Sequence, residues 1–160
     1  MATPKVKVMY GPVTRRLHII KRNGGNLQKP LAEIGEIILS SIEENFLQEG
    51  RYQSADTWHG GTNRWVDLAE STKEQRRKKG KWPGKKLQMS QGGLAASVTA
   101  NVSGDNLEIG TNKVYGAIQQ LGGKAGRNRS VNIPARPFLV VQDNDLDEAI
   151  DILGNHITKD

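Results

Sequence analysis

The feature of the sequence that most constrains its fold is an apolar repeat that begins at Leu27. Six apolar side chains follow one another at intervals of three or four residues: Leu27, Leu31, Ile34, Ile38, Ile42 and Phe46. This spacing places all of them on one side of an α-helix that ends near Gly50. The opposite side carries glutamates rather than bases, so the stripe predicts a helix that faces a protein core and not a membrane.

Shorter patterns on either side of this helix predict β-strands. Apolar and polar residues alternate at 6–10, and a second short run lies at 17–21. The mixed stretch at 94–102 predicts a helical turn followed by a strand, and a tight turn at 103–106 joins it to a returning strand at 107–111. These strands are short and close together, which indicates antiparallel pairing.

A second amphipathic helix is predicted to start near Asp143. Its apolar positions, taken as its buried stripe, are Leu146, Ile150, Leu153 and Ile157. The chain has 160 residues, the length of one domain. We therefore expect a single α+β domain over 1–160, with a small antiparallel sheet, two main amphipathic helices packed on one face, and long loops.

Two loops and two short helices are also expected. Residues 51–64, which include Trp58, and residues 124–130, which include Arg127 and Arg129, predict flexible loops that become ordered against partners. A short helix over 71–79, with Ser71 or Thr72 as its cap, should end at Gly80. Another carries Tyr115 and ends at Gly122 and Gly123.

Charge is distributed unevenly along the chain, whose net charge is +6. Residues 73–86 hold eight bases and one acid, whereas residues 142–160 hold six acids and one base. The basic run is a solvated helix face, a nucleic-acid patch or a site for an acidic partner. Its patch residues are Arg76, Arg77, Lys78, Lys79, Lys81, Trp82, Lys85 and Lys86. An aromatic side chain among lysines and arginines, as Trp82 is, suits the stacking of nucleobases in single-stranded nucleic acid. Opposite charges in one chain also suit head-to-tail self-association.

Motifs for catalysis, cofactors and metals are not found. The chain has no cysteine, and its three histidines lie far apart in the sequence. The glycines around Lys81 lack the spacing of a phosphate-binding loop, and no strained serine turn is present. We therefore expect no enzymatic activity, no cofactor, no metal and no small-molecule substrate. A small hydrolase remains an alternative without a motif, and no apolar run predicts a signal peptide or membrane span.

The middle and end of the sequence resemble a known family. Residues 109–123 read Ile-Gly-Thr-Asn-Lys-Val-Tyr-Gly-Ala-Ile-Gln-Gln-Leu-Gly-Gly, and residues 133–139 read Ile-Pro-Ala-Arg-Pro-Phe-Leu. With Trp65, Leu68 and the Ser90-Gln91-Gly92 segment upstream, they resemble the phage virion morphogenesis family, the tail-completion proteins of Mu-like and related phages. The resemblance covers about residues 27–157. Gln119-Gln120 stands where the family has a His-Gln pair.

The resemblance implies a structural protein that completes or terminates the head-proximal end of the phage tail and prepares it for joining to the head. Such proteins act as rings, often of six subunits, in the host cytoplasm during assembly and then in the virion. The implied partners are further copies of the chain, tail-tube proteins and head–tail connector proteins. Nucleic-acid binding through residues 73–86 is the alternative.

Arg136 is the most specific interface candidate. Pro134 and Pro137 hold its backbone extended, so its guanidinium can pair with a carboxylate of a neighbour or, equally, with Asp143 or Asp145 of its own chain. The interface candidates are Arg136, Asp143, Asp145, Arg127, Arg129, Tyr115 and Trp58. We expect Arg136→Ala or Asp145→Ala to weaken assembly with little loss of fold. Gly110 is expected to allow a close strand contact, and Asn112 to cap the helix of Tyr115.

Overall fold

The structure is a computed structural model that describes residues 11–51, 64–87 and 91–159, with side chains from residue 18 onward. Its elements are α1 (Gly11–Gly24), α2 (Gln28–Gln48), α3 (Glu70–Lys78), η1 (Ala95–Ser97), β1 (Val98–Ser103), β2 (Asn106–Thr111), α4 (Gly116–Leu121), β3 (Gly123–Ala125), η2 (Arg127–Arg129), β4 (Val131–Ile133) and α5 (Asp143–Thr158). This composition confirms a small α+β fold. The strand predicted at 6–10 and the loop residues 52–63 lie outside the described part.

Helix α2 is the central element, and it confirms the helix predicted from the apolar repeat. Ile34, Ile38, Ile42 and Phe46 are all buried along one side. Phe46 is 0% exposed, and its ring lies 5.7 Å from the ring of Trp65 and 5.3 Å from that of Phe138. The helix ends where predicted, because Glu49 and Gly50 take positive φ angles of 59° and 105°.

The first hairpin, β1–β2, covers one side of α2. Its strands pair antiparallel from Val98 opposite Thr111 to Ser103 opposite Asn106, which confirms the predicted turn. Val98, Leu107 and Ile109 pack against the core cluster. At Gly35 of α2 an added Cβ would lie 3.1 Å from Ala100 and 3.3 Å from Leu107, so this glycine allows the hairpin to approach the helix closely.

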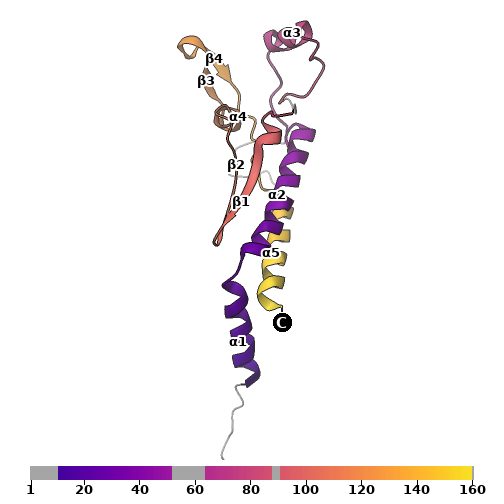
Figure 1. Cartoon of the computed structure of the whole chain (residues 1–160). Helices are drawn as coiled ribbons and strands as arrows, with labels where there is room; N and C mark the ends of the chain where they lie inside the picture. Colours follow the sequence, from indigo (N-terminus) through magenta and orange to yellow (C-terminus); the bar gives the residue numbers. More distant parts are fainter. Residues whose placement is uncertain (1–10, 52–63, 88–90, 160) are drawn as a thin grey trace, which may run out of the picture.

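Helix α5 runs beside α2 rather than on a sheet (Figure 1). The expectation of one sheet with both helices on one face is wrong in this respect, because the four strands of the described residues form two separate two-stranded sheets. Ala149, Ile152 and Leu153 of α5 pack against the core, so α2 contacts the hairpin through one part of its surface and α5 through another. The wide apolar side of α2 makes both contacts possible.

Residues 17–21, predicted as a strand, belong to helix α1. This helix packs against the C-terminal half of α5, at the opposite end of the molecule from α3 (Figure 1). The Asn23 side chain donates hydrogen bonds to the carbonyls of Ile157 and Lys159, at 3.4 and 2.7 Å. His156 Nε2 lies 2.8 Å from the carbonyl of Asn26. Contacts that are distant in sequence therefore stabilise a helix where local alternation suggested a strand.

Two further expectations need correction. Residues 124–130 lie within a second hairpin, β3–β4, and not in an unstructured loop: Gly123 pairs with Ile133 and Ala125 with Val131, and η2 forms the tip. Helix α3 starts after Ala69, without a side-chain cap from Ser71 or Thr72, and ends before Gly80 as predicted. After β4, residues 134–141 have no regular secondary structure.

Candidate assembly interface

The segment that follows β4 is built into the core through its backbone. The Trp65 indole nitrogen donates a 2.9 Å hydrogen bond to the carbonyl of Pro137. Asn45 of α2, which is 0% exposed, donates to the carbonyls of Pro137 and Phe138 at 3.2 and 3.1 Å. Because this stretch has no strand partner for these carbonyls, buried side chains satisfy them instead.

Helix α4 holds the other edge of the same segment. Gln120 Oε1 accepts hydrogen bonds from the backbone nitrogens of Phe138 and Leu139, at 2.9 and 3.0 Å, and its Nε2 donates to the Leu139 carbonyl. The Arg136 nitrogen donates to the carbonyl of Gln119 at 2.7 Å. The two parts of the sequence that carry the family resemblance are therefore one structural unit.

Glycines fix the geometry of this unit at two positions. A Cβ on Gly122, whose φ is +70°, would lie 2.7 Å from the nitrogen of Ala135 and 2.9 Å from the carbonyl oxygen of Ile133. A Cβ on Gly116 would lie 2.7 Å from the Thr111 methyl group. The role predicted for Gly110 is wrong, because a Cβ there meets open space. The role predicted for Asn112 is also wrong: Tyr115 precedes α4, without a side-chain cap.

Arg136 is 5% exposed and bonds to backbone carbonyls. Its Nε donates to the Val66 carbonyl and its Nη2 to the Asp67 carbonyl, both at 3.1 Å. It forms no ion pair with Asp143 or Asp145, both of which are among the described residues, so the intrachain alternative is wrong. Burial, and then the charge of Arg76, lower the pKa of Arg136 from its usual value, while Asp67 raises it. An arginine with so high a starting pKa stays charged at neutral pH.

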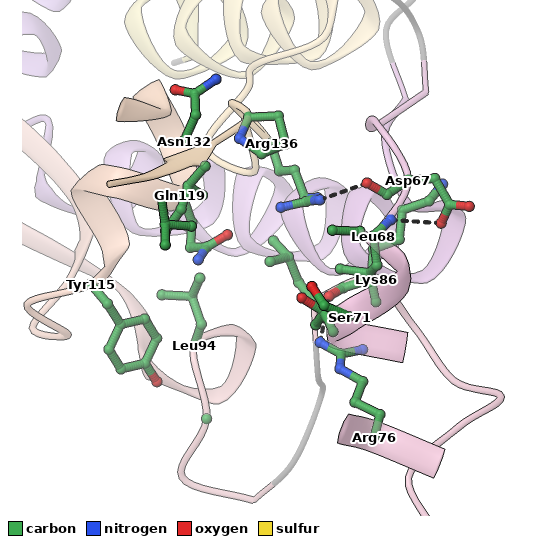
Figure 2. Close-up of a pocket in the computed structure, with 17 residues that line it drawn as sticks. Asp67, Leu68, Ser71, Arg76, Lys86, Leu94, Tyr115, Gln119, Asn132 and Arg136 are labelled. Carbon is green, nitrogen blue, oxygen red and sulfur yellow. Dashed lines mark hydrogen bonds between the residues drawn. The ribbon is translucent and has the colours of Figure 1, made fainter. Parts of the chain in front are cut away.

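Arg136 forms part of the wall of a cleft of about 650 Å³. One wall comes from the residues around α3 and the other from β4 and α4 (Figure 2). The apolar lining consists mainly of Leu68, Leu87, Leu94, Val131, Ile133 and Pro134. The charged lining consists of Arg76, Lys86, Arg136 and Asp67. Tyr115, a predicted interface residue, also lines the cleft and is 44% exposed.

The carboxylate of the cleft is already paired. Lys73 lies 2.9 Å from Asp67 and 2.6 Å from Glu70. The hydrogen bond from Lys73 is the largest cause that lowers the pKa of Asp67, and the bond to Glu70 is the largest that raises the pKa of Lys73. The cleft thus presents three cations and one carboxylate that a fourth cation partly neutralises.

The predicted basic patch is divided by the fold. Arg76 donates to the carbonyls of Lys85 and Lys86, and Lys86 pairs with Glu49, so these bases support the local structure. Lys85 donates to the Leu47 carbonyl. The Lys73 ammonium lies 5.7 Å from the centre of the Trp82 ring. The remaining bases are exposed: Arg77, Lys78, Lys79 and Lys81.

The acidic helix α5 buries a different side from the one predicted. Asp145 is 7% exposed, accepts a 2.6 Å hydrogen bond from Ser41 and another of 2.8 Å from the Gln142 nitrogen, and so is not available to a partner. Leu146 and Ile150, predicted to be buried, are 52% and 66% exposed. Asp143 is exposed. Loss of Asp145 should therefore destabilise the fold, contrary to the expectation that it affects assembly alone.

The other candidates lie apart from the cleft or outside the description. Arg127 and Arg129 are exposed in η2, at the tip of the second hairpin, and Trp58 lies outside the described residues. Sequence reasoning missed Asn45 and Gln120. Asn45 is an amide side chain next to the apolar stripe of α2, and Gln120 is an amide side chain within the motif at 109–123. Both could have been recognised as residues that hydrogen-bond to buried backbone groups.

No group of three or more His, Cys, Asp or Glu side chains among the described residues could hold a metal ion. No helix in the described ranges combines the length and the apolar character that crossing a membrane requires.

Comparisons with known proteins identify relatives of this chain. The model of the phage virion morphogenesis family matches residues 8–158. The chain is 47% identical over 68 residues to the Mu-like prophage FluMu G protein 2 of Haemophilus influenzae, a match that covers 38% of this chain and 49% of that protein. It is 28% identical over 122 residues to the putative capsid assembly protein G of Escherichia phage Mu, covering 76% of this chain and 73% of that protein. No solved structure matches.

Proposed function

The chain belongs to the phage virion morphogenesis family, and on that premise we propose that it is a tail-completion protein. Its role is structural assembly of the phage particle. In the proposal it closes the head-proximal end of the tail as a ring of copies and prepares the tail for joining to the head. It would be made in the host cytoplasm and remain in the virion, in contact with tail-tube and head–tail connector proteins.

The observation that carries this proposal is the chemical difference between two surfaces of one small family member. The exposed bases Arg77, Lys78, Lys79 and Lys81 lie on and just beyond α3. Helix α5 exposes four acids, Asp143, Asp147, Glu148 and Asp151, and holds no lysine or arginine. A ring is built from heterologous contacts, in which each copy offers two different surfaces. Opposite charges on these surfaces would steer the copies into one orientation.

Catalysis is not needed for this role. The buried Ser41–Asp145 pair contains a hydroxyl and a carboxylate, but its third member is Arg51, whose Nη2 donates to Ser41 Oγ at 2.8 Å. Ser41 Oγ donates to the Asp145 carboxylate, and both side chains are buried between α2 and α5. We therefore assign this group to holding α5 against α2.

A complementation assay tests the proposal. A phage or prophage that lacks this gene should yield free heads beside unjoined tails or tails of abnormal length in electron micrographs. Supplying the full chain in trans should restore joined particles. Normal joined particles in the absence of the chain would overturn the tail-completion role.

Nucleic-acid binding by the exposed bases of α3 is the second candidate. The four exposed lysines and arginines favour nucleic-acid binding. The Lys73 ammonium lies beside the Trp82 ring and competes with the stacking of a nucleobase on that face of the ring. Phosphate binding by these bases would release counterions, so affinity for an oligonucleotide should fall steeply with salt. An absence of measurable binding at low salt would exclude this candidate.

A further inference from the structure

We propose that the cleft between α3 and β4 receives the outer face of α5 from a second copy of this chain. The inference rests on the proposed ring and specifies the contact that would build it. Three observations support it: a cleft with more cations than carboxylates, a helix face that combines acids with exposed apolar residues, and the separation of these two surfaces on one molecule.

The cleft offers a positive wall over an apolar floor. Arg136 is almost fully buried, yet its side chain donates to the carbonyls of Val66 and Asp67 and to no carboxylate among the described residues. Buried charges in proteins are normally paired, so a guanidinium in a cleft wall is suited to a carboxylate from outside. Arg76 and Lys86 line the same cleft, which also holds one carboxylate, that of Asp67, so its charged lining has an excess of positive charge.

A second polar group in the cleft lacks a partner. Gln119 Oε1 is buried without a hydrogen-bond partner among the described residues, and Gln119 lines the same cleft as Arg136. Buried polar atoms are rarely left unpaired in stable structures. The cleft therefore holds one buried amide oxygen without a partner and one guanidinium that bonds to carbonyls but to no carboxylate, and a further molecule could complete both.

The outer face of α5 has the complementary composition. An α-helix turns 100° per residue, so Asp143, Asp147 and Asp151 form one row and Leu146 and Ile150 form the adjacent row. All five are exposed. Helix α2 also has an acidic side, but it exposes one large apolar residue, Leu47, whereas α5 exposes two. Of the two acidic helices, α5 is thus the better match to a cleft with an apolar floor.

The position of the two surfaces requires a second copy. The cleft lies between α3 and the second hairpin at one end of the molecule, whereas α5 lies along α2 and extends toward α1 (Figures 1 and 2). Each copy would use its cleft for one neighbour and its α5 for the other. Such a head-to-tail contact closes into a ring when its rotation permits. Leu146 and Ile150 would then lie on the apolar floor while the aspartates approach Arg136 and Arg76.

Crosslinking tests this contact directly, because the chain has no natural cysteine. The test variant combines Val131→Cys in the cleft with Ile150→Cys on α5, two positions that are 53% and 66% exposed. The control combines Ile150→Cys with Asn101→Cys, an exposed residue of β1. A short bis-maleimide is applied to tails purified from complemented phage and to the purified full chain at high concentration. We expect a ladder of crosslinked copies with the test pair and not with the control pair.

The outcomes separate this inference from the proposed function. If the wild-type chain restores joined particles but the test pair gives no ladder in tails that contain it, the contact is wrong and tail completion stands. A ladder with the control pair, or crosslinks from the Val131→Cys position to a different tail protein alone, would also overturn the contact. If the wild-type chain fails to complement, tail completion is wrong, and the ladder or its absence with the purified chain decides the contact.

Charge reversal, read out with the same crosslinker, provides a second test of whether the acids of α5 form the contact. Asp147→Lys with Asp151→Lys, added to the test pair, should lower the crosslinked yield about tenfold, because like charges then meet across the contact. The matched control, Asp105→Lys with Glu108→Lys on the first hairpin, makes the same change in net charge and should leave the yield within about twofold. Equal losses in both variants would show that net charge, not the α5 face, controls association.

Discussion

The two hairpins, β1–β2 and β3–β4, have the same topology but are held to the rest of the fold by different kinds of contact. Hairpin β1–β2 has strands of six residues whose side chains alternate between half-buried and exposed positions, and it contributes Val98, Leu107 and Ile109 to the core. Hairpin β3–β4 has strands of three residues that are mostly exposed and contributes nothing to the core cluster. Side-chain packing on α2 positions the first, whereas backbone contacts near Gly122 and Arg136 position the second.

This difference separates structural and functional roles within a small domain. A hairpin that depends on buried side chains is restricted to sequences that fill the space beside α2. A hairpin held by a glycine and by backbone hydrogen bonds keeps its own side chains available. Those side chains form one wall of the cleft, which is the surface that we assign to a second copy of the chain.

The largest effect is expected from Gly122→Ala, which tests the backbone support of the second hairpin. Gly122 has φ 70° and ψ −176°, a region that glycine alone adopts readily, and the new Cβ would meet the backbone of residues 133 and 135. We expect a loss of about 3 kcal/mol in the free energy of unfolding. Urea denaturation followed by tryptophan fluorescence measures it, with buried Trp65 as a reporter.

The matched control for this change is Gly110→Ala in the first hairpin. Gly110 lies in β2 and a Cβ there meets open space, so we expect a change of no more than about 0.5 kcal/mol. Equal losses at the two glycines would show that glycine geometry does not distinguish the hairpins.

Side-chain truncation should show the opposite dependence. Leu107→Ala removes a side chain that packs on the α2 core, and we expect a loss of about 2 kcal/mol, the lower end for a leucine that is only partly buried. Val131→Ala in β4 removes a side chain that is 53% exposed and should change stability by less than about 0.5 kcal/mol. The same denaturation measurement applies. A loss at Val131 as large as that at Leu107 would mean that the second hairpin also depends on packing.

The sequence predicted the elements whose signal is local. The stripe of α2 is long and regular, and the turn at 103–106 lies between two alternating segments, so both were found within one or two residues. The helix that starts at Asp143 was also placed correctly. In each case the periodicity or the turn residues suffice, because the element would present the same side to any apolar partner.

The errors occur where a distant contact outweighs the local pattern. Residues 17–21 lie in a helix that packs on α5, and Asn23 of this helix bonds to a carbonyl 134 positions away in the sequence. In α5, apolar periodicity selected Leu146 and Ile150 for burial, whereas hydrogen bonds from Ser41 and the Gln142 backbone bring Asp145 inside. Arg136 was recognised as important from its two flanking prolines, but its carbonyl partners at 66 and 67 follow from tertiary structure alone.

The smallest effect concerns the ion pair of Lys73 and Asp67 in the cleft wall that faces the second hairpin. Lys73→Gln should raise the pKa of Asp67 toward its ordinary value of 3.8, because the hydrogen bond that lowers this pKa is lost. A lowered carboxyl pKa contributes stability above pH 3.8 that disappears as the pH falls through the folded value. The raised pKa of Lys73 contributes stability below pH 10.5 that disappears as the pH rises through its folded value.

NMR titration of the Asp67 carboxyl measures the shift, with Lys78→Gln, a change at an exposed lysine of the same helix, as the control. Both residues of the pair are near the surface, so chemical denaturation should not detect the change. An Asp67 pKa that is the same with and without Lys73 would show that the two side chains do not pair in solution, and this cleft wall would then need another source of order.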